Sequence, residues 1–266
     1  MVESLLLAVT RVSTMSQYKP LTNATGFFFQ RDEKLFLVTC RHVVLDEANQ
    51  HCPERLEIEL HVDPENVAVT SQFSVPLYRD KKPLWRQGVD SAGMIDVAAI
   101  ELERAALPEA LLLQSFRPEH LVARLDDIEI GTPVLIAGFP LGFHDTLHHL
   151  PVARQAVIAS SFGIRFQGNG YFLTDARMHR GTSGGPVVAR MIGEQSSRSE
   201  LAWRLLGVHA ARMDVGNRDV QQDESLDLNC AWYADIILTL TEDPPAEKAS
   251  DRPSPVANPG SGKIKD

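Results

Sequence analysis

The sequence predicts an all-β protein with two groups of strands, on the basis of three observations. Short runs of Val, Ile, Leu and Phe are interrupted by Gly, Pro, Asn and Asp, which is typical of strands joined by turns. The runs fall into two groups, with an Ala- and Leu-rich segment between them. The apolar fraction of 44% over 266 residues is ordinary for a globular protein. We therefore expect two similar-sized β-barrels or sandwiches.

The first group of strands begins with a hairpin. In residues 25–44, TGFFFQRDEKLFLVTCRHVV, two apolar strands flank a polar turn from Gln30 to Lys34. Further strand signals lie in LEIELHV (56–62), AVTSQFSVPLY (68–78) and DVAAIEL (96–102). We expect an N-terminal domain over residues 1–104.

A connector is expected over residues 105–127, where Ala- and Leu-rich stretches suggest short helical turns broken at Pro108 and Pro118. The second domain is expected over residues 128–242, with strands at 133–139, 153–163, 171–177, 185–191, 203–210 and 229–240. Residues 243–266 are rich in Pro, Ser, Ala, Gly and charge, so they cannot bury enough apolar surface to offset the entropy of ordering. This composition predicts a disordered tail.

The charge distribution excludes some classes of partner. The formal net charge is -9 and no basic cluster is present, which argues against a nucleic acid or an anionic membrane surface as partner. The N-terminus has an acidic residue where a secretory signal would be basic, and its apolar run is short. The three cysteines, Cys40, Cys52 and Cys230, show no CxxC spacing and predict buried thiols in a reducing cytoplasm, with a Cys40–Cys52 bridge as the alternative.

The segment RGTSGGPVV, residues 180–188, contains a serine that fits two hydrolase motifs. The G-x-S-x-G elbow of α/β-hydrolases requires a helix after the serine and then an acid followed by a histidine. Pro186 and two valines follow Ser183 instead, which favours a strand. The histidine after Ser183 is His209, and no aspartate lies between them. The elbow motif is therefore not satisfied.

The alternative places a histidine and an aspartate upstream of the serine. LVTCRHVV, IDVAAIEL and TDARMHRGTSGGPVV resemble the histidine, acid and nucleophile segments of trypsin-like serine peptidases of the chymotrypsin fold, most closely their bacterial intracellular and HtrA-like branch. GTPVLIAGFPLG and LLGVHAARM resemble two supporting strands. The resemblance covers residues 26–240 and implies two six-stranded antiparallel β-barrels with the active site in the cleft between them.

The resemblance implies a catalytic triad of His42, Asp96 and Ser183. A serine hydroxyl is a weak nucleophile at neutral pH, and an imidazole can remove its proton and later protonate the leaving amine. The aspartate would hold the imidazole in the required tautomer. The backbone N–H groups of Gly181 and Ser183 are expected to form an oxyanion hole, since glycine permits the tight bend of such a loop.

Thr182 departs from the digestive members of the family, which carry an aspartate before the nucleophile. No activation by a new N-terminal amine is therefore implied, and the chain is either active as synthesised or regulated by a partner protein. The motifs agree best with HtrA proteins, but no PDZ-like segment follows Leu240. The rival hypothesis is a catalytically inactive scaffold that binds peptides or partner proteins.

The resemblance also implies a substrate pocket formed by Arg177, His209, Ala210 and Ala211. Arg177 corresponds to the base of the P1 pocket, and His209 corresponds to a histidine that contacts a P1 Glu or Gln in related peptidases. These residues predict a P1 preference for Glu, Asp or Gln. Alternatively, Arg177 points to solvent or pairs with Asp175.

No cofactor or metal is expected. Three histidines lie in FHDTLHHLP, namely His144, His148 and His149, but their spacing matches no established ligand pattern. We expect this segment to be a surface loop between strands.

Overall fold

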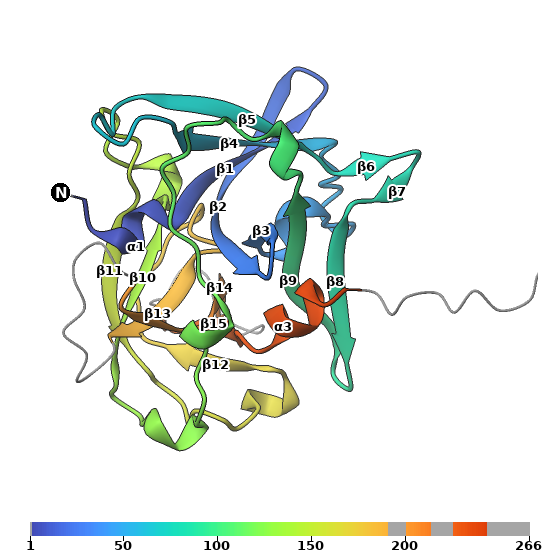
Figure 1. Cartoon of the computed structure of the whole chain (residues 1–266). Coiled ribbons are helices and arrows are strands. Elements are labelled where there is room, and N and C mark those ends of the chain that lie inside the picture. Colours follow the sequence, from blue (N-terminus) through green and yellow to red (C-terminus); the bar gives the residue numbers. More distant parts are fainter. Residues whose placement is uncertain (1, 191–200, 214–225, 244–266) are drawn as a thin grey trace, which may run out of the picture.

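In the part of the chain that the structure describes, two large antiparallel β-sheets are linked by an irregular connector (Figure 1). The computed structural model describes residues 2–190, 201–213 and 226–243. The expected tail, residues 243–266, lies outside this range except for its first residue. No helix in the described ranges is long and apolar enough to cross a membrane.

The first sheet has the strand order β5-β4-β1-β2-β3-β9-β8 in the described residues. Its strands are β1 Val9–Ser16, β2 Lys19–Arg31, β3 Lys34–Thr39, β4 Arg55–His61, β5 Thr70–Pro76, β8 Trp85–Asp90 and β9 Gly93–Leu102. A separate ribbon pairs β6 Tyr78–Arg79 with β7 Lys82–Pro83. Residues of β4 alternate between buried and partly exposed positions, as expected for a strand with one face on a core.

The second sheet has the order β11-β10-β13-β14-β15-β12 in the described residues. Its strands are β10 Pro133–Gly138, β11 Val152–Val157, β12 Tyr171–Thr174, β13 Pro186–Arg190, β14 Trp203–Arg212 and β15 Asn229–Tyr233. The α-helices are α1 Ser4–Leu7, α2 Arg41–Val44 and α3 Ile236–Thr241. Short 3-10 turns are η1 Arg104–Ala106, η2 Pro118–His120, η3 Leu125–Asp127, η4 Pro140–Gly142 and η5 Phe166–Gly168.

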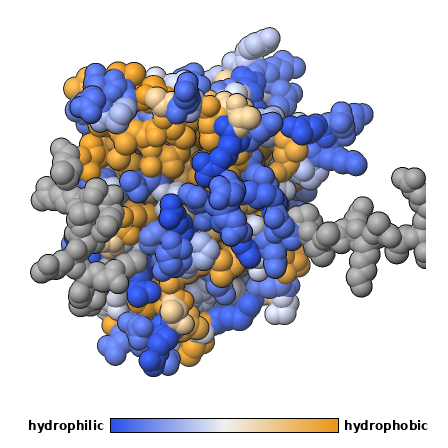
Figure 2. All heavy atoms as spheres, in the orientation of Figure 1, coloured by the Kyte–Doolittle hydropathy of each residue, from blue (hydrophilic) through white to orange (hydrophobic). Residues whose placement is uncertain are grey.

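One apolar cluster joins the two sheets. It contains Phe27 and Phe36 of the first sheet together with Val188 and Val208 of the second, all fully buried. A smaller cluster around Phe172 belongs to the second sheet. On the molecular face in Figure 2, hydrophobic side chains gather toward the upper left and hydrophilic ones cover most of the rest. Because the larger core is shared, each sheet depends on the other for burial of its apolar residues.

The structure confirms the predicted β fold and the hairpin of residues 25–44, in which β2 pairs with β3. Two expectations are wrong in detail. The first sheet has seven strands among the described residues instead of the six implied by the resemblance, and two of them, β1 and β8, lie in segments without a predicted strand; β1 pairs with β2, and β8 pairs with β9. The predicted strand 229–240 is β15 followed by α3, which packs its buried Ile237 into the shared core.

Candidate active site

The predicted histidine and aspartate meet at the end of the first sheet. His42 lies in α2, directly after β3 rather than within it, and Asp96 lies in β9 next to β3. His42 Nδ1 is 2.7 Å from Asp96 Oδ2, and the His42 backbone N–H donates to Asp96 Oδ1 at 2.8 Å. Since an ionised carboxylate only accepts hydrogen bonds, His42 Nδ1 carries the proton. The lone pair of His42 Nε2 can then accept a second proton.

Asp96 also changes the basicity of this imidazole. Burial alone lowers the pKa of His42, but the hydrogen bond that His42 donates to Asp96, the negative charge of Asp96 and that of Asp46 outweigh burial and raise the pKa above its ordinary value of 6.5. The imidazole is therefore a stronger base than a free histidine.

Ser183 comes from the second sheet, in the loop between β12 and β13, and the next residue, Gly184, lies against Thr25 of β2 and Thr39 of β3. The loop bends at Gly181 (φ +95°) and Gly184 (φ +88°), in the left-handed region that favours glycine. A Cβ atom on Gly184 would lie 2.1 Å from the Thr25 carbonyl oxygen. Both conformation and space therefore require glycine at this position.

The Ser183 hydroxyl donates to the Ala210 carbonyl oxygen at 2.8 Å. This carbonyl is available because the register between β14 and β15 shifts between His209 and Ala211, so that Ala210 is left out of the ladder. No hydrogen bond joins Ser183 to His42 within the described residues. A rotation about the Ser183 side-chain torsion would have to exchange the Ala210 carbonyl for His42 Nε2 before proton transfer.

The two predicted oxyanion donors have no other acceptor in the part of the chain that the structure describes. Leu141 N–H holds the Arg180 carbonyl at 2.6 Å, and in a trans peptide the following N–H, that of Gly181, points the opposite way. The Thr182 carbonyl accepts from Gly185 N–H at 2.9 Å, so the Ser183 N–H points away from Gly185 in the same manner. Within the described residues both N–H groups therefore remain available as donors to an anionic oxygen.

Thr25 of β2 anchors the serine loop to the first sheet, a role that the sequence analysis missed. Its hydroxyl donates to the Gly181 carbonyl at 2.7 Å, and its backbone N–H donates to the Ser183 carbonyl at 2.9 Å. The hydroxyl oxygen also accepts from Phe139 N–H at 3.1 Å. Thr25 is buried, and its hydroxyl both donates and accepts a hydrogen bond. Because these contacts join residues that are distant in the sequence, no local motif identifies Thr25.

The four predicted pocket residues have different environments. His209 and Ala210 are buried in β14, whereas Arg177 and Ala211 are exposed. Asp175 accepts a hydrogen bond from the Val157 backbone at 2.7 Å, and no ion pair between Arg177 and Asp175 is found among the described residues. The exposed position of Arg177 agrees with the solvent-facing alternative.

His209 is held in place by its backbone. Its N–H donates to the Gly185 carbonyl at 2.8 Å, and its carbonyl accepts from Gly184 N–H at 2.8 Å and from Cys40 Sγ at 3.3 Å. Nδ1 of the side chain is buried without a hydrogen-bond partner in the described residues. Burial, with the nearby charge of His42, lowers the pKa of His209 to about 4. His209 is therefore neutral at pH 7.

The three cysteines carry free thiols, and no disulfide joins Cys40 to Cys52. Cys40 is buried beside the active site, and Cys52 is exposed. Burial raises the pKa of the Cys40 thiol well above its ordinary value. Because the thiolate is the reactive form of cysteine, a raised pKa makes Cys40 a poor nucleophile at neutral pH.

Two antiparallel β-sheets that bring a His–Asp pair from one and a glycine-flanked serine from the other define the class of two-barrel serine peptidases. The family model described as trypsin-like peptidase domain matches residues 24–194, which is more than half of the chain. The chain belongs to the trypsin-like peptidase family. A search of curated proteins found no match.

Solved structures of similar fold include an HtrA-type protease with a tripeptide, with 16% identity, a TM-score of 0.52, and coverage of 88% of this chain and 58% of that chain. A second is the serine endoprotease from Yersinia pestis, with 17% identity, a TM-score of 0.51, and coverage of 89% and 62%. At these identities the likeness concerns the fold. The chain spans about 60% of the length of these two proteins.

Proposed function

We propose that the protein is a serine endopeptidase that cleaves protein substrates through an acyl-enzyme on Ser183. The observation that carries the proposal is the 2.7 Å contact between His42 Nδ1 and Asp96, beside a serine loop with two unused N–H groups. The Ser183 oxygen attacks the scissile carbonyl as His42 Nε2 removes its proton. The N–H groups of Gly181 and Ser183 stabilise the oxyanion.

Collapse of this tetrahedral intermediate breaks the peptide C–N bond. His42 gives its proton to the leaving amine, and the acyl group stays on Ser183. Water then attacks the ester, with His42 again taking a proton, and the acid product leaves with the serine restored. Asp96 stabilises the imidazolium at each step without accepting its proton.

The neutral state of His209 favours Gln over Glu within the proposed P1 preference. A neutral imidazole donates a hydrogen bond to a carboxamide oxygen without a charge, whereas burial of a carboxylate beside it would need a compensating cation. Arg177, the residue expected to provide that cation, is exposed. A P1 Glu or Asp substrate would depend on movement of Arg177 toward the pocket.

The remaining proposals concern context. The free thiols of all three cysteines support a reducing, cytoplasmic compartment. Domain limits at 1–104 and 128–242, with a connector at 105–127, are proposed because the two sheets lie within them. We also propose that a partner protein regulates the enzyme through the serine loop, because the oxyanion hole depends on the positions of the peptide groups that carry Gly181 N–H and Ser183 N–H.

A peptide library derived from a whole proteome tests the function. We expect the wild-type protein to cleave it and Ser183→Ala to leave it intact. Ser161→Ala, which alters an exposed serine outside the site, is the matched control and should cleave normally. Equal cleavage by wild type and Ser183→Ala would overturn the proposal.

The same library tests the pocket. We expect cleavage after Gln to exceed cleavage after Glu and Lys, and the preference to diminish in His209→Ala. Equal cleavage after Lys and Gln would refute the role of His209 and leave the peptidase proposal standing.

A further inference from the structure

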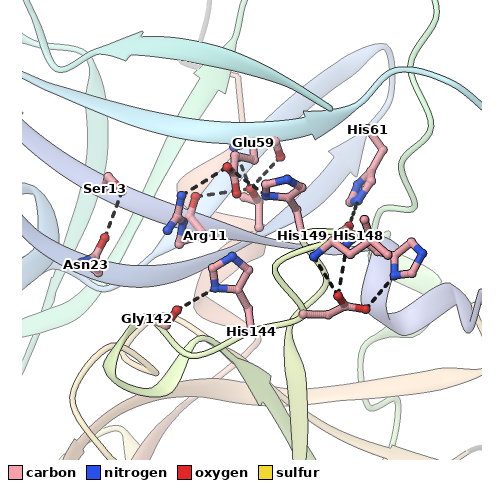
Figure 3. Close-up of polar contacts among 12 residues, drawn as sticks. Arg11, Ser13, Asn23, Glu59, His61, Gly142, His144, His148 and His149 are labelled. Atoms are coloured by element: carbon pink, nitrogen blue, oxygen red, sulfur yellow. Dashed lines mark hydrogen bonds and ion pairs between the residues drawn. The ribbon is translucent and has the colours of Figure 1, made fainter. Parts of the chain in front are cut away.

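The loop between β10 and β11 brings two histidines to a carboxylate of the other sheet. His144 and His149 extend from this loop toward Glu59 of β4, as Figure 3 shows. One potential ligand atom from each of the three side chains lies within 4.8 Å of the other two. Spacing within FHDTLHHLP gave no metal motif because the third ligand lies in a distant strand.

The tautomer of His144 suits a metal ligand. His144 Nδ1 is 2.6 Å from the Gly142 carbonyl oxygen, which can only accept, so Nδ1 carries the proton. The lone pair therefore resides on Nε2. A metal-binding histidine is commonly fixed by such a bond from its other nitrogen to a backbone carbonyl.

His149 and Glu59 lie close together without satisfying each other. His149 Nδ1 is 3.2 Å from Glu59 Oε1, yet it forms no hydrogen bond with any described residue, and neither does the buried Glu59 Oε2. The Glu59 side chain is 11% exposed. Buried polar atoms without partners are rare and destabilising, and a cation bound between His149 Nδ1 and the Glu59 carboxylate would engage both groups. Two ligands of a tetrahedral Zn²⁺ ion are about 3.4 Å apart. The 3.2 Å between His149 Nδ1 and Glu59 Oε1 is close to this value.

An ion pair without a metal is the competing explanation. Arg11 Nη2 lies 3.2 Å from Glu59 Oε1 and partly balances the carboxylate charge. Together with the His149 side chain, whose Nδ1 is 3.2 Å from the same oxygen, Arg11 would account for Oε1. This ion-pair explanation leaves Glu59 Oε2 without a partner and gives no reason for the position of His144. A metal accounts for all three side chains and retains Arg11 as an outer hydrogen-bond donor to the carboxylate.

We propose that Glu59, His144 and His149 form a Zn²⁺ site that ties the β10–β11 loop to the first sheet. Two imidazoles and one carboxylate form a donor set that Zn²⁺ uses, with the fourth position left to water. A further contact already holds this loop, because His61 Nε2 donates to the His148 carbonyl at 2.8 Å. The metal would add a second attachment between the β10–β11 loop and the first sheet.

The proposed metal is coupled to the oxyanion hole through a short path. His144 bonds the Gly142 carbonyl, and the adjacent Leu141 N–H holds the Arg180 carbonyl that orients Gly181 N–H. Occupancy of the site should therefore favour the competent form of the oxyanion loop. This second consequence rests on the proposed peptidase activity, whereas metal binding does not.

The test is Zn²⁺ binding to the full chain carrying Ser183→Ala, which prevents self-cleavage. After treatment with a chelator, equilibrium dialysis against Zn²⁺ should give one bound ion per chain. Glu59→Gln and His149→Gln should each weaken binding by about 100-fold or more. The matched control is His148→Gln, since this neighbouring histidine pairs with Asp145 at 2.7 Å and should leave affinity unchanged within twofold.

A second set of variants excludes binding at the catalytic residues. Cys40, His42 and Asp96 also place potential ligand atoms within 4.8 Å of one another, so His42→Gln is added to the Ser183→Ala background. We expect it to retain the ion. Retention in Glu59→Gln and His149→Gln with loss in His42→Gln would overturn the proposal, as would failure of the unmodified site to bind Zn²⁺. If Glu59→Gln does not fold, as judged by circular dichroism, His144→Gln replaces it with the same expected loss.

Discussion

At the residue scale, the proposed peptidase activity depends on the protonation state of His42. Its pKa is raised, because the hydrogen bond and charge of Asp96 outweigh burial. The base must be neutral to act, so activity is lost as pH falls through this raised value. We therefore predict an acid limb of kcat/KM above pH 6.5. Asp96→Asn should move the limb to lower pH and reduce kcat by about 10⁴-fold. A wild-type limb below pH 6 would contradict the assignment, as measured with a peptide substrate from pH 5 to 9.

The pKa of His209 is shifted in the opposite direction to that of His42, and this shift affects the stability of the fold. Its pKa of about 4 is lower than that of an unfolded histidine, so the unfolded chain binds more protons between pH 6.5 and 4. The free energy of unfolding should therefore decrease as the pH is lowered from 6.5 to 4, by about 3 kcal/mol in total. Urea unfolding of the wild type and His209→Gln at pH 7 and 4.5 measures the difference. An equal pH dependence in both proteins would show that His209 is not the group involved.

The residues predicted from sequence share a common property. His42, Asp96 and Ser183 were predicted from side chains within local motifs, and the structure places His42 Nδ1 2.7 Å from Asp96 Oδ2. Thr25, Leu141 and Ala210 act through contacts of the backbone or contacts between sheets, which leave no motif. The environment of Arg177 could not be predicted either, because burial of one side chain depends on tertiary packing.

At the element scale, β2 and the serine loop act as one unit through Thr25. Thr25→Val keeps the side-chain shape but removes the bonds to the Gly181 carbonyl and Phe139 N–H. We predict a loss of about 1–3 kcal/mol in stability, because buried polar groups lose their partner. We also predict a fall in kcat of at least about 10-fold, since a misplaced oxyanion donor loses part of the 10²–10³-fold effect of such a group.

Thr14→Val provides the control for this prediction. Thr14 is also a buried threonine, and its hydroxyl is 2.8 Å from that of Thr22, away from the serine loop. It should lose similar stability with kcat unchanged. Equal effects of both variants on kcat would show that Thr25 acts only through general stability.

The elements themselves were predictable where a regular pattern existed. The alternation in LEIELHV gave β4, and the apolar runs flanking a polar turn gave the β2–β3 hairpin. The helix α3 was missed because IILTL has strand-like composition, although its tertiary contacts favour a helix. β1 was missed because its polar residues obscured the alternation.

At the scale of the whole molecule, the shared core should make the two sheets unfold together. Ile237 of α3 is fully buried in that core, and Arg86 of β8 donates to the Leu240 carbonyl at 3.3 Å and to the Glu242 carbonyl at 2.6 Å. Ile237→Ala should cost about 2–5 kcal/mol and keep a single unfolding transition. Thr239→Ala, at an exposed position, is the control. Two separate calorimetric transitions would contradict the shared core.

The proposed activation of Ser183 by His42 can be measured by labelling with a fluorophosphonate, followed by mass spectrometry of peptides. We predict one covalent adduct on Ser183 in the wild type, slower labelling in His42→Ala, and none in Ser183→Ala. An adduct on another residue, or no labelling of the wild type across pH 6 to 9 with or without Zn²⁺, would contradict it.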